Sequence, residues 1–276
     1  MEKKLKQALN KKQKIVAMVA PSFVVDFSYP EIIWNLKKLG IDKVVELTFG
    51  AKMVNRGYHS VLNSSKELKI SSVCPGIVDI IEKKYPFYKK NLICVDSPMI
   101  AMAKVCKKIY PQHKVLFVSP CNYKKIEATN SKFVDIVIDY KELKKIFEEK
   151  KISSSGSKIF FDKFYNDYTK VYPLTGGLSK TAHLKGIVKK KEIKIIDGVK
   201  KVMKFLNKPN KKIKFLDCNF CVGGCIGGPC VANKEKTSKR KKRVLNYLQQ
   251  SLREDIPETR KGLVKRAEGI SFVKNY

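Results

Sequence analysis

Residues 213–230 of the 276-residue chain read IKFLDCNFCVGGCIGGPC, and this stretch decides how the rest is interpreted. It begins as an apolar, strand-like run and continues as a loop in which Cys218, Cys221, Cys225 and Cys230 alternate with glycines. Glycine has no Cβ, so the backbone of such a loop can lie close to a bulky inorganic group and direct N–H groups at sulfur. Clustered thiolates are the ligands of iron–sulfur clusters and of zinc. The loop therefore predicts a metal site.

The composition is that of an ordinary globular protein, with 43% hydrophobic residues. The sequence shows no apolar run as long as a membrane span, and its first residues, MEKKLKQALNKKQK, lack the apolar stretch of a signal peptide. We therefore expect a cytoplasmic protein with no membrane partner. In a reducing cytosol the 8 cysteines favour metal ligation over disulfides.

The formal net charge of +33 suggests a nucleic-acid partner, because clustered Lys and Arg bind phosphates. Most of the cations are lysines spread along the whole chain, which is equally typical of a lysine-biased proteome. The one dense cluster is residues 234–243 (KEKTSKRKKR), a pattern that is more often a solvated helix start than a binding patch. We expect no nucleic-acid partner.

Apolar runs that indicate strands alternate with segments that indicate helices, which predicts an α/β fold of largely parallel sheets flanked by helices. The predicted strands are 14–20, 43–47, 68–72, 114–118, 133–138, 193–196 and the run from 213. The predicted helices are 30–39, 77–84, 97–110, 140–150, 198–206 and about 234–252. Residues 1–12 are interpreted as a basic lead-in, residues 48–67 as a looser segment, and residues 151–158 (KISSSGSK) as a flexible loop.

We expect two α/β lobes, at 13–112 and 113–208, then the cysteine- and glycine-rich cluster loop at 209–232 and a basic C-terminal helix and tail at 233–276. Ligands of parallel sheets bind at the carboxyl ends of strands. Four predicted strands end in turns with reactive or rigid residues: 20–22, 74–76, 120–121 and 217–230. If these ends converge, three loops bring thiolates to one site in the cleft between the lobes.

Taken in order, these turns resemble the motifs of a known family, the C-terminal domain of the large subunit of [FeFe] (iron-only) hydrogenases, from about residue 15 to residue 229. Residues 20–22 (APS) resemble the first active-site turn of that family, and 72–76 (SVCPG) its first cysteine motif. Residues 119–127 (SPCNYKKIE) resemble the second cysteine motif, and 221–228 (CVGGCIGG) the third. The turn at 175–177 (TGG) also has a counterpart in relatives.

The resemblance implies a [4Fe-4S] cluster between two lobes, held by the thiolates of four cysteines. In catalytic relatives the last of these thiolates also bridges to a diiron unit with CO and cyanide, which completes the H-cluster. Lys124 would donate a hydrogen bond to a cyanide, and Pro21 and Ser22 would line the other side. The implied ligands are Cys74, Cys121, Cys221 and Cys225.

The chain departs from catalytic members at several positions. Those members usually have two adjacent cysteines before Pro-Gly, the first of which relays protons; here Val73 stands there and cannot transfer a proton. Residues 49–61, where catalytic relatives place acidic relay residues, contain no carboxylate. Ser119 and Asn219 replace methionines that commonly flank the diiron site, and no ferredoxin-like region precedes the domain. These departures predict that rapid hydrogen turnover is lost, as in sensory or non-bidirectional members.

We therefore predict a hydrogenase-like iron–sulfur protein of an anaerobe, acting in redox sensing or electron transfer with a ferredoxin-like or other redox partner protein. One alternative is an [FeFe] hydrogenase or hydrogen sensor with a complete diiron H-cluster, which leaves open whether the chain is an oxidoreductase. The other is a zinc-stabilised basic nucleic-acid-binding protein. Cys218 and Cys230 are spare thiols or alternate ligands of a local cluster or zinc site.

Overall fold

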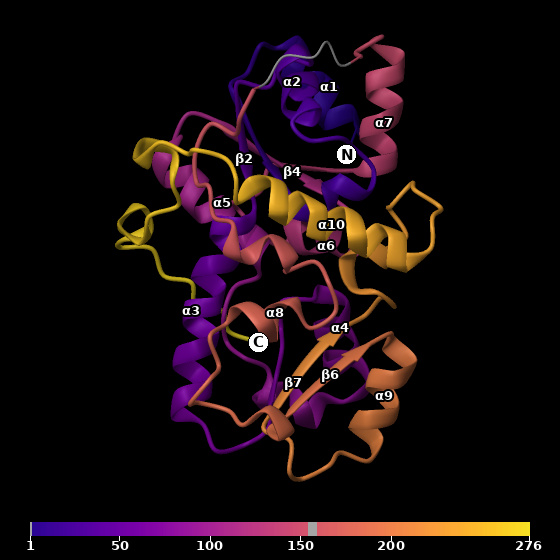
Figure 1. Ribbon diagram of the computed structural model, residues 1–276. Coiled ribbons are helices and arrows are strands. Elements are labelled where there is room, and N and C mark those ends of the chain that lie inside the picture. The colour runs from indigo at the N-terminus through magenta and orange to yellow at the C-terminus, as the bar shows by residue number, and fades with distance from the viewer. Residues whose placement is uncertain (1, 154–158) are drawn as a thin grey trace.

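The computed structural model describes residues 2–153 and 159–276. It confirms an α/β fold, with two separate parallel sheets covered by helices (Figure 1). The predicted loop at 151–158 lies mostly outside the described residues. In the part of the chain that is described, no helix is both long and apolar enough to cross a membrane.

The first sheet is four-stranded and parallel, in the order β2-β1-β4-β5. Every residue of β1 is buried, as its continuous apolar run predicts for a strand covered on both faces. Helices α1, α2 and α7 pack on one face, and α5 packs on the other. The elements are β1 (Ile15–Val19), β2 (Lys43–Glu46), β4 (Lys114–Ser119), β5 (Ile136–Asp139), α1 (Glu2–Asn10), α2 (Glu31–Lys38), α5 (Pro98–Ile109) and α7 (Tyr140–Glu149).

The second sheet is three-stranded and parallel, in the order β3-β7-β6. Its hydrophobic neighbours are α4 and α9 in one cluster and α3 and α8 in another. The elements are β3 (Lys69–Ile70), β6 (Ile193–Asp197), β7 (Phe215–Asn219), α3 (Thr48–Ser64), α4 (Pro75–Lys84), α8 (Gly177–Thr181) and α9 (Val199–Asn207).

The two sheets do not follow the predicted boundary between residues 112 and 113. The first sheet takes β1 and β2 from one side of that boundary and β4 and β5 from the other. The second sheet takes β3 from before it and β6 and β7 from after it. Strand pairing depends on contacts distant in sequence, which local patterns do not specify. The chain therefore passes between the sheets more than once.

The prediction that residues 48–67 form a looser segment is wrong, because most of this range is the long helix α3. Phe49 and Met53 pack in the core of the first sheet, whereas Tyr58 and Leu62 pack in the core of the second. Figure 1 shows α3 running along one side of the molecule from one sheet to the other. The helix contacts α5 closely at Gly50, where a Cβ would lie 2.7 Å from Met102 Cβ. The expected lead-in at 1–12 is also helical, as α1.

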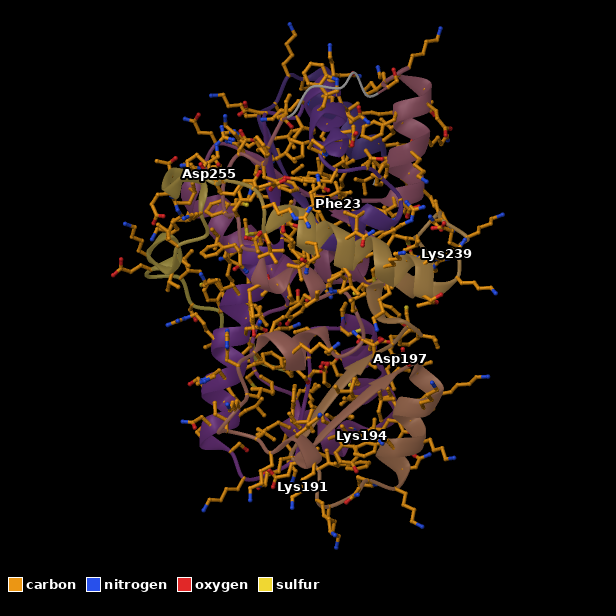
Figure 2. All side chains as sticks on the ribbon, viewed as in Figure 1. Phe23, Lys191, Lys194, Asp197, Lys239 and Asp255 are labelled. Atoms are coloured by element: carbon orange, nitrogen blue, oxygen red, sulfur yellow. The ribbon has the colours of Figure 1, made fainter. Side chains whose placement is uncertain are left out.

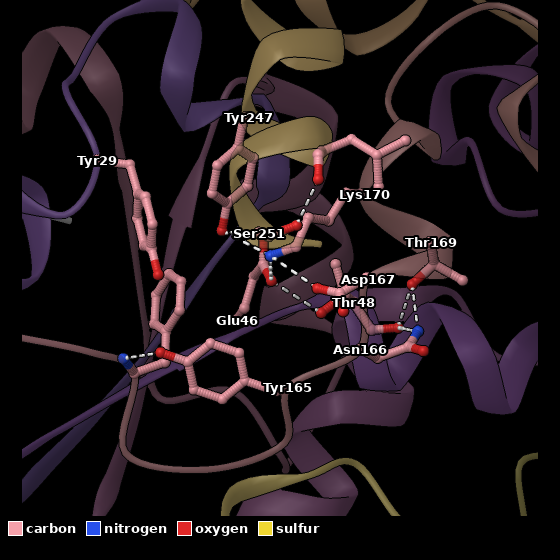
Figure 3. Close-up of polar contacts among 12 residues, drawn as sticks. Tyr29, Glu46, Thr48, Tyr165, Asn166, Asp167, Thr169, Lys170, Tyr247 and Ser251 are labelled. Atoms are coloured by element: carbon pink, nitrogen blue, oxygen red, sulfur yellow. Dashed lines mark hydrogen bonds and ion pairs between the residues drawn. The ribbon is translucent and has the colours of Figure 1, made fainter. Parts of the chain in front are cut away.

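A buried polar network fixes the C-terminal helix α10 (Thr237–Ser251) and the short 3₁₀-helix η3 (Tyr168–Val171) to the end of β2 (Figure 3). Lys170 Nζ lies 2.8 Å from Glu46 Oε2, and both side chains are 0% exposed. The Tyr247 hydroxyl donates to Glu46 Oε1 at 2.8 Å and accepts from Lys170 Nζ at 2.9 Å. Thr48 Oγ1 donates to Glu46 Oε2 at 3.0 Å. A buried charge is tolerated when it is paired and hydrogen-bonded in this way.

The remaining elements are short or lie on the surface. Figure 2 shows lysine side chains, including Lys191, Lys194 and Lys239, extending into solvent from widely separated parts of the molecule. The high charge is therefore spread over the surface. The other helices are α6 (Asn122–Thr129), η1 (Pro21–Val25), η2 (Pro86–Asn91), η4 (Lys190–Glu192), η5 (Gly224–Gly227), η6 (Glu258–Arg260) and η7 (Val264–Ala267).

Candidate metal centre

Three loops that are distant in sequence meet between the two sheets. Cys74 is the N-cap of α4, Cys121 is the N-cap of α6 after β4, and the cluster loop follows β7. The rings of Tyr123 and Phe220 lie 4.9 Å apart. A Cβ on Gly76 would lie 2.9 Å from both rings, so α4, α6 and the cluster loop are in direct contact here.

Glycines allow the cluster loop to approach its neighbours closely. Gly224 has φ +71°, and a Cβ there would lie 2.6 Å from the carbonyl oxygen of Pro173. A Cβ on Gly228 would lie 2.7 Å from the carbonyl oxygen of Pro120. The N–H of Cys225 donates to Pro173 O at 2.8 Å. The loop is thus fixed on one side to the segment after η3 and on the other to the Cys121 turn.

The three loops enclose a small cavity of about 90 Å³. Most of its wall is apolar, including Ala51, Val73 and Phe117. The polar and thiol side chains of the wall come from the turns that the sequence singled out, together with residues of the segment before α8. Those that match the predicted site are Pro21, Ser22, Cys74, Cys121, Lys124 and Cys225.

The predicted ligand thiols share one electrostatic environment. Cys225 is an exposed residue that faces the cavity. The protein atoms packed around its thiol raise the pKa, and charge on Cys74, Cys121 and Cys221 raises it further. Burial, followed by the charges of Cys74 and Cys121, raises the pKa of Cys221 to about 12. Four thiolates gathered here are therefore unfavourable unless a cationic group lies between them.

The described residues do not form a site for a single zinc ion. Within residues 2–153 and 159–276, no three His, Cys, Asp or Glu side chains are close enough together to hold a single metal ion. Four sulfurs bound to one zinc at about 2.3 Å would lie only about 4 Å apart. A [4Fe-4S] cluster needs one cysteine for each iron, so its four sulfurs are spread around a larger body. The zinc-based prediction is not supported.

Backbone and side-chain donors are directed at the same region. The pKa of the Cys121 thiol is raised by burial and by Cys74, but the N–H groups of Lys124 and Tyr123 at the start of α6 oppose the rise. Tyr172 lines the cavity, and its hydroxyl is buried beside it with no hydrogen-bond partner in the described part of the chain. Burial raises the pKa of Tyr172 well above its usual value, so it remains a donor. These donors fit a negatively charged, sulfur-rich group.

Lys124 is held with its amine beside the first cysteine turn. Its Nζ donates to Glu127 Oε2 at 2.6 Å and to the carbonyl oxygen of Val73 at 3.3 Å. Ser97 Oγ donates to the same Glu127 oxygen at 3.1 Å, which orients the carboxylate. On the opposite wall, Ser22 Oγ is 2.6 Å from the hydroxyl of Tyr140.

The two alternate cysteines lie outside the cavity wall. Cys218 is in the core of the second sheet, where its N–H donates to Ser71 Oγ at 2.9 Å. Cys230 Sγ donates to Asn122 Oδ1 at 3.0 Å. Burial raises the pKa of both thiols, to about 12 for Cys230. Cys221 lies outside the cavity wall as well, so the role of Cys218 and Cys230 as alternate ligands stays a prediction.

The sequence interpretation missed Asp197, which joins two of the motif turns. This carboxylate at the end of β6 accepts a hydrogen bond from Gly223 N at 2.7 Å and another from Thr175 Oγ1 at 2.8 Å. It therefore fixes the cluster loop relative to the turn before α8. The signal available in the sequence was an acidic residue directly after a predicted strand and before a glycine.

Comparison with known proteins identifies relatives of this chain. Residues 13–229 match the family described as the iron only hydrogenase large subunit, C-terminal domain. The chain is 25% identical over 297 aligned positions to Iron hydrogenase 1 of Clostridium pasteurianum, covering 82% of this chain and 51% of that protein. It thus spans about half the length of that curated relative.

Solved [FeFe]-hydrogenase structures have the same fold. HydA1 from Chlamydomonas reinhardtii aligns with a TM-score of 0.70 and 17% identity, covering 94% of this chain and 90% of that one. A structure that describes stepwise assembly of the H-cluster in a HydA protein aligns with a TM-score of 0.69 and 17% identity, covering 96% and 91%.

Proposed function

The chain belongs to the family formed by the C-terminal domain of the iron-only hydrogenase large subunit, and we propose that it binds a [4Fe-4S] cluster and acts in redox sensing or electron transfer. The proposed ligands are Cys74, Cys121, Cys221 and Cys225. The observation that supports the proposal most directly is the shared environment of these four thiols from three separate loops.

The surroundings of the thiols support ligation of iron. Cys74 and Cys121 each precede the first turn of a helix, where N–H groups and the helix dipole stabilise a thiolate. Lys124 adds a positive charge on the cavity wall. A bound cluster would supply the electron-accepting centre, while these residues would hold it, offset its charge and keep water out.

The cavity wall lacks the groups that rapid proton transfer requires. Val73 and Ala51 contribute apolar side chains to the cavity wall. Among the described residues that line the cavity, the one carboxylate is that of Asp217. That carboxylate accepts from both the N–H and the hydroxyl of Ser179, at 3.0 and 2.7 Å. Burial raises the pKa of Asp217, although the hydrogen bonds from Ser179 oppose the rise. These features favour a role in sensing or electron transfer over fast hydrogen production.

A ferredoxin-like redox protein is the proposed partner, in the cytoplasm. The cluster loop reaches the surface at Val222, which is 62% exposed between Cys221 and Gly223. The net charge of +33 would attract an acidic electron carrier, since complementary charge increases association rates.

The cluster assignment can be tested by metal analysis and spectroscopy. We expect about four irons and four sulfides per chain after anaerobic reconstitution, with an EPR signal on reduction. Replacing any proposed ligand by serine should reduce the iron content, whereas Cys94→Ser, at an exposed position away from the cavity, should not. Fewer than about four irons in the wild-type protein would contradict the proposal.

A second candidate function is that of a hydrogenase or hydrogen sensor with the complete diiron H-cluster. It is favoured by the cavity beside Cys225, whose wall contains Lys124, Pro21 and Ser22, and by the unpartnered hydroxyl of Tyr172. Infrared bands of bound CO and cyanide after co-expression with maturation proteins would support this function. If these bands are absent and the [4Fe-4S] signal is retained, only the first proposal remains supported.

A further inference from the structure

A second cavity, of about 720 Å³, lies on another side of α3 and is separate from the proposed metal centre. Its walls come from α3, from η3 and from the end of α8. This volume is in the range of small-molecule sites, about 300–1,000 Å³. The residues that matter most are Lys52, Asn55, Arg56, His59, Thr181 and His183.

The lining is basic and contains no carboxylate. Among the described residues, neither Lys52 nor Arg56 lies within ion-pair distance of an acidic group, and the one hydrogen bond of Lys52 Nζ goes to the carbonyl oxygen of Gly262 at 3.0 Å. Burial, followed by the charge of Arg56, lowers the pKa of Lys52. Two neighbouring cations without a counterion favour binding of an anion.

A buried amide in the same wall lacks a hydrogen-bond donor. Asn55 is 5% exposed, and its Nδ2 donates to Thr181 Oγ1 at 2.9 Å. Thr181 Oγ1 itself donates to Gly177 O at 2.8 Å, so it must accept from Asn55, and this fixes the orientation of the amide. Asn55 Oδ1 is buried and accepts no hydrogen bond from the part of the chain that the structure describes. This oxygen is closed off from solvent, so the amide joins α3 to α8 through Thr181 and is not itself a contact for a ligand.

His183 is held at the rim in an unusual backbone conformation. Its φ is +52°, in the left-handed region that residues other than glycine rarely adopt. The imidazole stacks on Tyr168, with ring centroids 4.6 Å apart and planes 8° apart. Strained backbone retained beside a cavity is a feature of ligand sites.

We infer that this cavity binds a small phosphorylated molecule, with its phosphate on Lys52 and Arg56. His59 and His183 would add donors at the rim. Arginine binds phosphate oxygens in a bidentate manner, and lysine adds a point charge. The inference goes beyond the proposed function and does not depend on a cluster, because none of the proposed cluster ligands lines this cavity.

The site also shares both helices with the metal centre. Ala51 of α3 and Leu178 of α8 line the cluster cavity, one and three residues from Lys52 and Thr181. A ligand that shifts either helix would therefore alter both cavities.

Isothermal titration of the whole 276-residue chain with inorganic phosphate, ribose 5-phosphate and adenosine 5′-monophosphate tests the inference. We expect at least one of the two organic phosphates to bind tenfold or more tightly than inorganic phosphate, since only they are large enough to fill the cavity beyond Lys52 and Arg56. Arg56→Gln and Lys52→Gln should each weaken binding at least tenfold. Lys201→Gln, on α9 with a side chain 69% exposed, is the control and should bind within twofold of wild type.

Three outcomes would overturn the inference. One is the absence of saturable binding for all three probes. Another is equal affinity of wild type and Arg56→Gln, which is a surface position and should fold normally. The third is tight oligonucleotide binding that Arg56→Gln leaves unchanged, since that would assign phosphate affinity to the general basic surface.

Discussion

Replacing Lys170 by methionine should destabilise the protein strongly, because it leaves Glu46 buried without its cation. Both side chains are 0% exposed, and their charged atoms are 2.8 Å apart. Breaking a buried pair by removing one partner costs about 3–5 kcal/mol. For a chain of this size, with a denaturant slope near 3 kcal/mol per molar urea, the midpoint should fall by roughly 1–2 M.

Anaerobic urea unfolding, followed by far-UV circular dichroism, measures the effect. Lys83→Met is a matched control, because Lys83 also pairs with a carboxylate, at 2.7 Å from Asp79, but is 71% exposed. This control should leave the midpoint unchanged. Glu46→Gln combined with Lys170→Met should recover most of the loss, because glutamine keeps hydrogen-bonding groups for Tyr247 and Thr48 without the unpaired charge.

The reasoning would be refuted if Lys170→Met unfolded at the same urea concentration as wild type. It would also be refuted if the double variant were less stable than Lys170→Met alone. Iron content gives a second readout, because Lys170 lies just before Pro173, whose carbonyl accepts from Cys225 N at 2.8 Å. We expect Lys170→Met to retain less cluster than the Lys83→Met control.

Three further predictions concern the metal centre and acid stability. Gly224→Ala should reduce cluster incorporation, measured as iron per chain, whereas Gly269→Ala should not: the two have φ of +71° and +72°, but only at Gly224 would a Cβ lie within 4 Å of other atoms. Lys124→Met and, to a smaller extent, Tyr172→Phe should make the reduction potential of the cluster more negative, because each variant removes a group that stabilises added negative charge. Spectroelectrochemical titration measures this shift. An unchanged potential in both variants would contradict the proposed position of the cluster beside Lys124 and Tyr172. Burial opposes ionisation of Asp135, but hydrogen bonds from Lys107 Nζ at 2.7 Å and Val115 N at 2.8 Å outweigh it and lower the pKa. Stability from this group is present above about pH 4 and is lost as pH falls through the lowered pKa, so Asp135→Asn should be less stable at pH 7 and lose less on acidification, as thermal unfolding across pH would show.

Strands of the first sheet were predictable because they are largely buried on both faces and therefore appear as continuous apolar runs. Residues 14–20 and 114–118 show this pattern, and β1 and β4 occupy them within two residues at each end. Helix α3 was not predictable from local pattern, because its two glycines and its β-branched residues have low helix propensity. Its stability comes from packing against α5 and both sheets, which only the tertiary structure shows.

The cysteines of the site could be predicted as an ordered set, and their assignment as ligands stays a prediction. Sequence order could not show which other residues approach them. Asp197 has only the weak signal of an acidic residue between a predicted strand and a glycine, and Tyr172 has none. The contacts of Asp197 join segments more than twenty residues apart, and Tyr172 lines a cavity. The basic cavity on α3 was hidden for the same reason, because its wall combines residues 52–59 with residues 166–183.

The crossing of the chain between the two sheets has a consequence for biogenesis. The turns that bear Cys74, Cys121 and Cys225 follow strands β3, β4 and β7, and β4 belongs to a different sheet from the other two. No contiguous fragment shorter than residues 74–225 can supply these three sulfurs, and a nascent chain lacks the last of them until β7 and the loop after it have left the ribosome. If the proposed cluster is bound, its assembly therefore has to wait until all of these segments have been synthesised.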